Sequence, residues 1–296
     1  MRLVVAGSSG FLGTSLVSSL RRSRHDVVRL VRRPSAARDE YTWDPPAGRV
    51  DPAALEGADV VVNLCGAGVG DKRWSAARKQ LLRDSRIEPT EVLATAVAEH
   101  GVPTLINASA VGYYGDTGDR PVDESSPKGT GFLTDLCRDW EGATEPAAKA
   151  GVRVVRLRMG IVLSPIGGLL GKLRPLFSLM LGGRFGEGRQ YMSWVHLDDA
   201  LAVVDIVLED DSLAWPVNVC APNPVTNAEF TRRLGAALGR PAPWVVPAFA
   251  LRAILGELAD EGLLAGQRVL PQVLADKDFS FRYPTIDGAL STVARG

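Results

Sequence analysis

The chain lacks several features that would assign it to common classes of protein. Lys+Arg and Asp+Glu both number 34 among its 296 residues, so the formal net charge is zero. This balance, with no long block of one sign, argues against nucleic acid or an anionic membrane surface as a partner. No stretch reaches the roughly 18 continuous apolar residues of a membrane-spanning helix. The apolar run at residues 1–6 is too short for a signal peptide, so we expect a soluble, cytoplasmic protein.

Cysteine and histidine are also scarce. The three cysteines and the three histidines are widely separated, and neither set has the spacing of a disulfide framework or of a metal site. We therefore predict no structural metal. With 296 residues the chain is long enough to form a full α/β core with one additional lobe.

A glycine-rich turn near the N-terminus is the strongest positive signal. It follows an apolar run at residues 3–6 and precedes a helical pattern, which is the order of strand, turn and helix that a dinucleotide site requires. Gly7 permits the tight turn, Gly10 lets the backbone approach a pyrophosphate, and Gly13 lets helix and strand pack closely. The helix N-terminus then directs free N–H groups at the phosphates. The predicted cofactor contacts in this turn are Gly7, Ser9, Gly10, Phe11, Leu12 and Gly13.

Strand and helix patterns alternate along the chain, which is typical of a parallel sheet with crossover helices. The apolar runs at residues 27–31, 60–64, 104–108 and 153–157 indicate strands, and residues 76–99 indicate a helix that Pro89 kinks or breaks. Residues 193–196 and 216–219 resemble short strands that return to the main sheet. We predict an α/β fold: a Rossmann-type doubly wound parallel sheet with a smaller, partly interleaved C-terminal substrate lobe. Residues 1–165 with 190–222 would form the dinucleotide domain, and residues 166–189 with 223–296 the substrate lobe.

The end of the second predicted strand indicates which dinucleotide is bound. An NAD site has an acidic residue there, whereas this chain has Val31, Arg32 and Arg33. Guanidinium groups would bind a ribose 2′-phosphate in bidentate fashion, so we predict NADP(H). The alternative is that both arginines belong to a solvated loop end. The next predicted strand ends in a segment of small residues that includes Leu64, Cys65 and Gly66. A dinucleotide could lie on the backbone of this segment, but small residues here would also fit plain close packing.

The glycine spacing, G-x-x-G-x-x-G, resembles the short-chain dehydrogenase/reductase superfamily in its extended branch. There a serine at a strand end hydrogen-bonds the substrate oxygen and a tyrosine exchanges the proton. A lysine four residues further on lowers the tyrosine pKa, ordinarily about 10. Ser109 follows the strand at residues 104–108 and fits the serine. With Glu141 as the anchor, however, Leu133 occupies the tyrosine position and Cys137 the lysine position, one helical turn apart. The proton-transfer pair is absent.

Five further sequence segments indicate which group within the superfamily the chain resembles. They are residues 72–74, 109–115, 186–190, 193–196 and 266–271, and together they extend over nearly the whole chain. The chain resembles the atypical short-chain dehydrogenases/reductases of the epimerase family, some members of which carry cell-division-inhibitor names. In that family a cysteine often replaces the lysine, and an arginine, here Arg86, replaces an asparagine. The resemblance implies an NADP(H)-binding extended fold with a small C-terminal domain. The contacts it implies are the glycine turn, Arg32, Leu64, Cys65, Arg86, Ser109 and the strand end from Met159 to Val162.

Each catalytic candidate also has a structural interpretation. Tyr113 and Tyr114 are the nearby tyrosines that could donate a proton, but packing of the loop explains them equally well. Cys137 could act as a base or a ribose partner, since free cysteine titrates near about 8.5, or it could fill the core as a small hydrophobe. His196 next to Asp198 suggests an acid–base dyad, but the spacing favours a structural histidine at a strand-to-helix turn.

Two functional hypotheses follow. The first is an NADP(H)-dependent epimerase or reductase in which Ser109 polarises the substrate oxygen. Its substrate would be a hydroxyl or carbonyl metabolite in the cleft between the lobes, possibly a nucleotide sugar by analogy with the extended branch. The second is a non-catalytic NADP(H)-binding regulator that senses the cofactor and acts through a protein partner, as the missing tyrosine and lysine would suggest. We predict no particular oligomeric state.

Overall fold

The computed structural model describes residues 1–292; the last four residues of the predicted substrate lobe, 293–296, lie outside the described residues. The main sheet has eight strands in the order β13-β8-β6-β5-β1-β2-β3-β4. Their bounds are β1 (Arg2–Ala6), β2 (Asp26–Val31), β3 (Glu40–Asp44), β4 (Arg49–Val50), β5 (Val60–Asn63), β6 (Thr104–Ala110), β8 (Arg153–Met159) and β13 (Trp215–Val219). All neighbours in this sheet pair in parallel except β3 and β4. The order reverses between β1 and β5, so the predicted doubly wound α/β sheet is confirmed.

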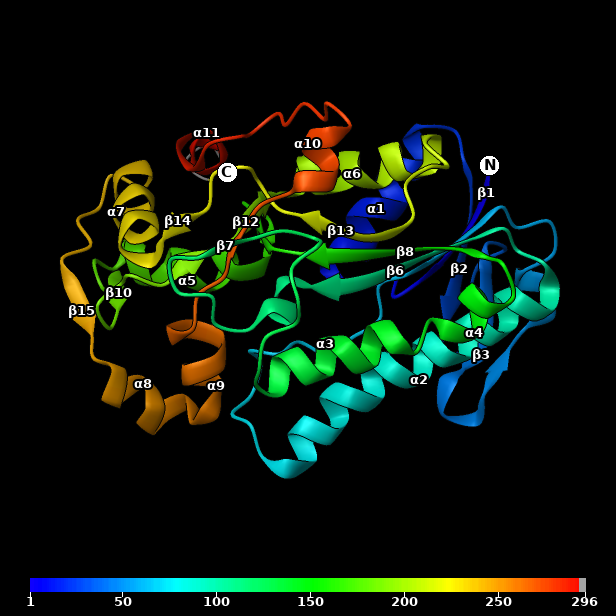
Figure 1. The fold of residues 1–296 in the computed structure, drawn as a ribbon, viewed down its shortest axis with the longest axis horizontal. Helices are drawn as coiled ribbons and strands as arrows, with labels where there is room; N and C mark the ends of the chain where they lie inside the picture. Colours follow the sequence, from blue (N-terminus) through cyan, green and yellow to red (C-terminus); the bar gives the residue numbers. More distant parts are fainter. Residues whose placement is uncertain (293–296) are drawn as a thin grey trace.

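Helices cover both faces of this sheet, which explains why its central strands are continuous apolar runs (Figure 1). On one face, α1 (Phe11–Arg22) and α6 (Leu197–Glu209) share an apolar cluster with the strands, to which Leu16 and Val203 belong. On the other face lie α2 (Ala76–His100), α3 (Phe132–Gly142) and α4 (Glu145–Lys149), with Leu93 and Ala147 in a second cluster. Short 3-10 turns η1 (Pro45–Ala47) and η2 (Pro52–Ala54) connect the strands at the β4 end.

Of the predicted kink or break at Pro89, the break is wrong, because α2 continues as one helix through this residue, and the kink stays a prediction. Proline removes one backbone donor from the helix. The neighbouring Thr90 hydroxyl donates to the Arg86 carbonyl at 2.7 Å, and the buried Leu93 and Val97 anchor the following turns in the core. Tertiary packing on both sides of the proline therefore holds the helix together.

The smaller lobe is made of short elements around its own apolar cluster, which includes Trp194, Phe230 and Leu234. Its strand pairs are β9 (Ile161–Ser164) with β12 (Trp194–His196), β10 (Gly183–Phe185) with β15 (Trp244–Val246), and β11 (Tyr191–Met192) with β14 (Val225–Thr226). The remaining helices are α5 (Gly168–Ser178), α7 (Asn227–Ala237), α8 (Ala248–Leu255), α9 (Glu257–Ala259), the π-helical turn η4 (Asp260–Leu264), α10 (Gln272–Asp276) and α11 (Ile286–Ser291). Of these, α10 packs against β13, and its Leu274 belongs to the core of the main sheet. The strand β16 (Arg268–Val269) pairs with β7 (Pro121–Val122) and so ties this lobe to the loop after β6.

Two segments predicted to return to the main sheet behave differently. The strand β13 does so, as the edge strand beside β8, which confirms the prediction for residues 216–219. The strand β12 pairs with β9 in a separate two-stranded sheet, so the prediction for residues 193–196 is wrong. The domain boundaries themselves stay a prediction. Among the described residues, no helix is both long enough and apolar enough to cross a membrane.

Candidate functional site

The glycine turn lies at the carboxyl end of β1, where the strand order reverses. Gly7 has φ +77°, and a Cβ on it would lie 2.7 Å from the Leu64 carbonyl carbon. A Cβ on Gly13 would lie 2.2 Å from the Gly7 oxygen, so helix and turn approach as closely as the sequence implied. Gly10 precedes α1, and no side chain in the described part of the chain caps this helix. Uncapped N–H groups therefore face the strand ends, and this backbone fits the phosphates of a dinucleotide.

Phe11, at the start of α1, meets the smaller lobe. Cβ atoms on Gly167 and Gly168 would lie 3.0 and 3.3 Å from its ring, so the start of α5 crosses the glycine turn. Leu64, Met159 and Val162 pack around the same apolar cluster as α1. The structure thus brings together predicted contacts from four separate segments. The close approach of Gly167 was not predicted, because it depends on how the two lobes meet.

The two arginines after β2 occupy different environments. The Arg33 guanidinium donates to both oxygens of Glu40 on β3, at 2.8 and 2.6 Å, and Glu40 also accepts from the Ala36 N–H at 2.8 Å. The Glu40 side chain is 2% exposed. Its pKa is lowered to about 2, first by the hydrogen bonds from Arg33 and then by that from Ala36. Arg32 makes no hydrogen bond or ion pair to any described residue. Glu40 thus already holds the Arg33 guanidinium, and the role of Arg33 at a 2′-phosphate stays a prediction.

Arg86 is buried beneath the loop that follows β5. Its guanidinium donates to the carbonyl oxygens of Ala67 and Leu82, at 2.9 and 3.1 Å, and lies over the Trp140 ring at 5.1 Å. A Cβ on Gly66 would lie 3.1 Å from its Cζ. Burial lowers the Arg86 pKa. Arg86 therefore supports the backbone on which a dinucleotide would rest. Burial likewise raises the pKa of the neighbouring Cys65 to about 12, against an opposing effect of the nearby Arg32.

A buried ionic network occupies the end of β6 and β8. Arg158 is 4% exposed and donates from Nε and Nη2 to the two oxygens of Glu141, at 2.8 and 2.9 Å. The Ser109 hydroxyl donates to Glu141 at 2.7 Å. Tyr114 donates to Asn218 at 2.7 Å and accepts from Arg158 at 2.9 Å. Burial alone would lower the Arg158 pKa, but the hydrogen bonds and charge of Glu141 outweigh it and hold that pKa above its ordinary value.

This network decides how the four catalytic candidates are placed. Ser109 is 2% exposed and points to Glu141, and burial raises the pKa of Tyr114 to about 12. Burial also raises the pKa of Cys137 to about 12, which does not suit a base near neutral pH. Tyr113 is half-buried, lies with its ring 3.5 Å from the Arg158 guanidinium carbon, and has a hydroxyl without a hydrogen bond to any described residue. The catalytic assignments stay predictions, and the geometry favours Tyr113 among them.

The position of the missing tyrosine, Leu133, borders a cavity between the lobes, whereas Cys137, at the lysine position, is buried and does not line it. A Cβ on Gly112 would lie 3.5 Å from the Leu133 Cβ and 3.7 Å from the Cys137 Sγ. The cavity has a volume of about 360 Å³ and is lined by Gly112, Gly115, Asp116, Thr130, Leu133, Thr134, Arg252, Asp260, Glu261, Leu264, Ala265 and Gln267. Its position beside Leu133 makes it the candidate substrate site.

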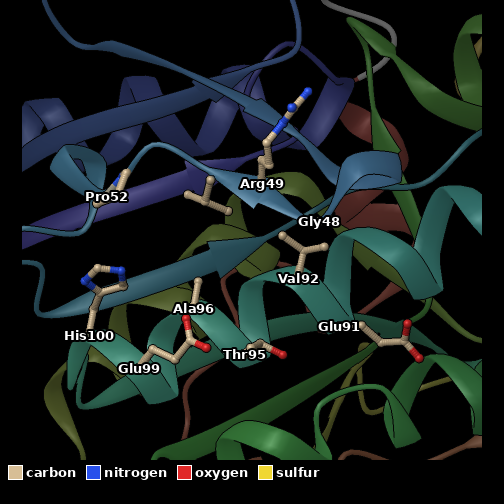
Figure 2. A pocket seen from close by; sticks show the side chains of 10 residues that line it. Gly48, Arg49, Pro52, Glu91, Val92, Thr95, Ala96, Glu99 and His100 are labelled. Carbon is tan, nitrogen blue, oxygen red and sulfur yellow. The ribbon is translucent and has the colours of Figure 1, made fainter.

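A second cavity, of about 550 Å³, lies between α2 and β4 and contains none of the predicted site residues. Figure 2 shows Arg49 on one side of it and Glu91, Glu99 and His100 along the helix on the other. His196 lies elsewhere and has a structural role: its Nδ1 accepts from the Asp198 N–H at 3.2 Å and so caps α6. This placement agrees with its interpretation as a structural histidine.

Comparison with known proteins agrees with this fold and this glycine turn. Residues 3–220 match the model of the NAD dependent epimerase/dehydratase family, and residues 246–293 match a domain of unknown function, DUF1731. The chain is 54% identical over 288 residues to epimerase family protein Mb2239 of Mycobacterium bovis, which covers 97% of this chain and 96% of that protein. The chain therefore belongs to the NAD-dependent epimerase/dehydratase family, which confirms the resemblance inferred from its motifs.

Two solved structures are similar over the whole chain. The crystal structure of human epimerase family protein SDR39U1 (isoform 2) with NADPH has a TM-score of 0.90 and 31% identity, covering 100% of this chain and 99% of that one. The nucleoside-diphosphate sugar epimerase of Corynebacterium glutamicum has a TM-score of 0.82 and 37% identity, covering 99% of this chain but 58% of that one. Both support a Rossmann-type epimerase-family fold.

Proposed function

We propose that this chain binds NADP(H) across the glycine turn and the ends of β2 and β5. The observation that carries the proposal is the uncapped, close-packed turn from Gly7 to Gly13, whose backbone fits a pyrophosphate. Val31 leaves no carboxylate to repel a 2′-phosphate, and Arg32 is free to pair with one. The similarity to human SDR39U1, whose structure contains NADPH, supports the same cofactor.

We infer further that the protein is an NADP(H)-dependent oxidoreductase or epimerase acting on a hydroxyl or carbonyl compound, in the cytoplasm. When bound, NADP(H) supplies or accepts a hydride at its nicotinamide ring. The chain's own contribution is to hold the substrate in the cavity beside Leu133 and to exclude water from it. Tyr113 is the proposed proton donor, because its hydroxyl alone among the four candidates is uncommitted to another described residue. Its ring lies against the Arg158 guanidinium, whose central carbon is 3.5 Å from the ring centroid.

A second candidate function is a sensor that binds NADP(H) without chemistry and signals through a protein partner. The burial of Ser109, Tyr114 and Cys137, together with Leu133 at the tyrosine position, favours it. Such a protein would retain cofactor affinity and transfer no hydride.

The first experiment is a fluorescence titration of the purified protein with NADPH and with NADH. A preference for NADPH supports the site, and binding of neither contradicts both functions. NADPH carrying deuterium at the nicotinamide C4 is then incubated with the protein and a metabolite extract. Enzymatic transfer should label a metabolite, and Tyr113→Phe should suppress the label without changing NADPH affinity. Transfer by neither protein, with NADPH bound, would favour the sensor.

A further inference from the structure

The cavity beside Leu133 has walls from both lobes. Gly112 and Thr130 come from the segment between β6 and α3, and Thr134 from the first turn of α3, whereas Arg252, Asp260 and Gln267 come from the segment around α8 and η4. Its volume of about 360 Å³ is near the lower end of the range for small-molecule sites. In a cavity of this size any ligand lies close to the charged groups of the walls, so these groups restrict which ligand can bind.

Each charged side chain in the cavity wall already has a protein partner. Both oxygens of Glu261 accept from backbone N–H groups at the start of α3, Phe132 and Leu133, at 2.8 Å each. Asp260 pairs with the Arg252 Nε at 2.8 Å.

Asp116 completes the set of charged groups. One of its oxygens accepts from the Gly118 and Gly266 N–H groups, at 3.2 and 3.1 Å. The wall thus holds three carboxylates and one guanidinium, and that guanidinium is paired.

This arrangement disfavours a phosphate. A helix N-terminus is ordinarily a favourable place for an anion, but at α3 the Glu261 carboxylate occupies it. Gly131, with φ +114°, allows this approach: a Cβ on it would lie 3.1 Å from the Glu261 carboxyl carbon. An anionic ligand would meet three carboxylates, and the one guanidinium of the wall, Arg252, is already paired with Asp260, so repulsion between like charges would weaken its binding.

Other groups in the wall suit an uncharged ligand. The Thr130 hydroxyl and the Gln267 side-chain amide make no hydrogen bond to another described residue. Leu133, Leu264 and Ala265 supply apolar surface beside them. A small molecule with a carbonyl or hydroxyl group and an apolar body would match both.

We propose that this cavity selects an uncharged small carbonyl or hydroxyl compound and excludes phosphorylated ones, nucleotide sugars among them. The inference rests on the proposed function, because the cavity is connected to the cofactor only through that assignment. Analogy with the extended branch suggested a hydroxyl or carbonyl metabolite, possibly a nucleotide sugar, and this proposal restricts the substrate to the uncharged compounds of that class. Gln267 and Thr130 become the groups that orient the substrate oxygen.

The test uses the wild-type protein saturated with NADP+ and four probes: benzaldehyde, 4-carboxybenzaldehyde, 4-(trimethylammonio)benzaldehyde and UDP-glucose. Affinities come from saturation-transfer NMR titrations. We expect benzaldehyde to bind at least about tenfold more tightly than the carboxylate probe and UDP-glucose, since like charges repel. Tighter binding of either anion would overturn the proposal, as would absence of benzaldehyde binding. Tighter binding of the cation would show that the carboxylates recognise the ligand, which would also overturn it.

Two variants sharpen the test. Gln267→Leu should weaken benzaldehyde about fivefold, the effect of one lost hydrogen bond, whereas the control Gln80→Leu on the exposed part of α2 should not. Glu261→Ala should empty the α3 N-terminus and strengthen 4-carboxybenzaldehyde while leaving benzaldehyde nearly unchanged. No change in the anion's affinity would contradict the role of Glu261. NADPH affinity, measured in parallel, separates the two proposals: its absence in the wild type overturns the proposed function, and a preference for anions with NADPH bound overturns only the cavity's specificity.

Discussion

The buried pair of Glu141 and Arg158 makes a quantitative prediction about stability. In Glu141→Gln the amide keeps the shape of the carboxyl group, but Arg158 retains its charge at 4% exposure without a counter-charge. Removing one partner of a buried ion pair destabilises a protein by about 3–5 kcal/mol. That is a large part of the roughly 5–15 kcal/mol by which a native protein is stable. With an unfolding entropy of about 2.1 cal/mol/K per residue, the melting midpoint should fall by about 5–8 °C.

The assay is differential scanning calorimetry of the cofactor-free protein, with guanidinium unfolding to confirm the free-energy change. The matched control is Glu145→Gln, which removes the same charge from an exposed pair with Lys149 on α4. Exposed pairs contribute little, so the control should leave the midpoint essentially where it is in the wild type. Equal midpoints for Glu141→Gln and Glu145→Gln would refute the reasoning, because burial would then make no difference to the loss of the carboxylate.

Three further predictions concern the cofactor site. Arg32→Gln should weaken NADPH binding about tenfold or more and leave NADH binding unchanged, because a charge-assisted phosphate contact is lost. Arg33→Gln should change the NADPH/NADH ratio of dissociation constants much less, and equal effects of the two variants would contradict the pairing of Arg33 with Glu40. The pKa of Glu40 is about 2 in the folded protein and ordinarily 4.5, so its stabilising contribution is present above pH 4.5 and is lost as the pH falls toward 2. Acid unfolding curves of the wild type and Arg33→Gln should therefore converge in that window. Gly13→Ala would place a Cβ 2.2 Å from the Gly7 oxygen, so titrations with NADPH and NADH should show that dinucleotide binding is abolished. Normal binding by this variant would show that the turn can relax.

The glycine turn was predictable because its determinants are local. Gly7 and Gly13 are required by backbone geometry within one strand, one turn and one helix, and the sequence shows all three in order. The alternation of strands and helices likewise determined the sheet. The same local rules failed at Pro89, where buried side chains on either side keep α2 continuous, and at residues 193–196, whose partner strand β9 lies in another part of the chain.

The catalytic candidates were harder because their roles depend on distant partners. Ser109 lies at the predicted strand end, but its hydroxyl points to Glu141, 32 residues away. Arg33 follows the predicted strand, but Glu40 reaches it only because β3 pairs beside β2. A position in a motif indicates which backbone edge a residue occupies. It does not indicate whether the side chain is free, because that depends on elements folded against it.

The difference between a residue's position in a motif and the availability of its side chain also matters for the proposed chemistry. A short-chain dehydrogenase places tyrosine and lysine over the substrate, and here Leu133 and Cys137 stand in those positions, next to a glycine at 112. Leu133 has no group that could exchange a proton, the Cys137 thiol is buried, and the Glu141 carboxylate one turn further along α3 is held by Arg158 and Ser109. For the proposed enzyme we therefore expect the proton to come from a residue outside the superfamily's pattern, and Tyr113, whose hydroxyl makes no hydrogen bond to another described residue and whose ring lies against the Arg158 guanidinium, is the proposed donor.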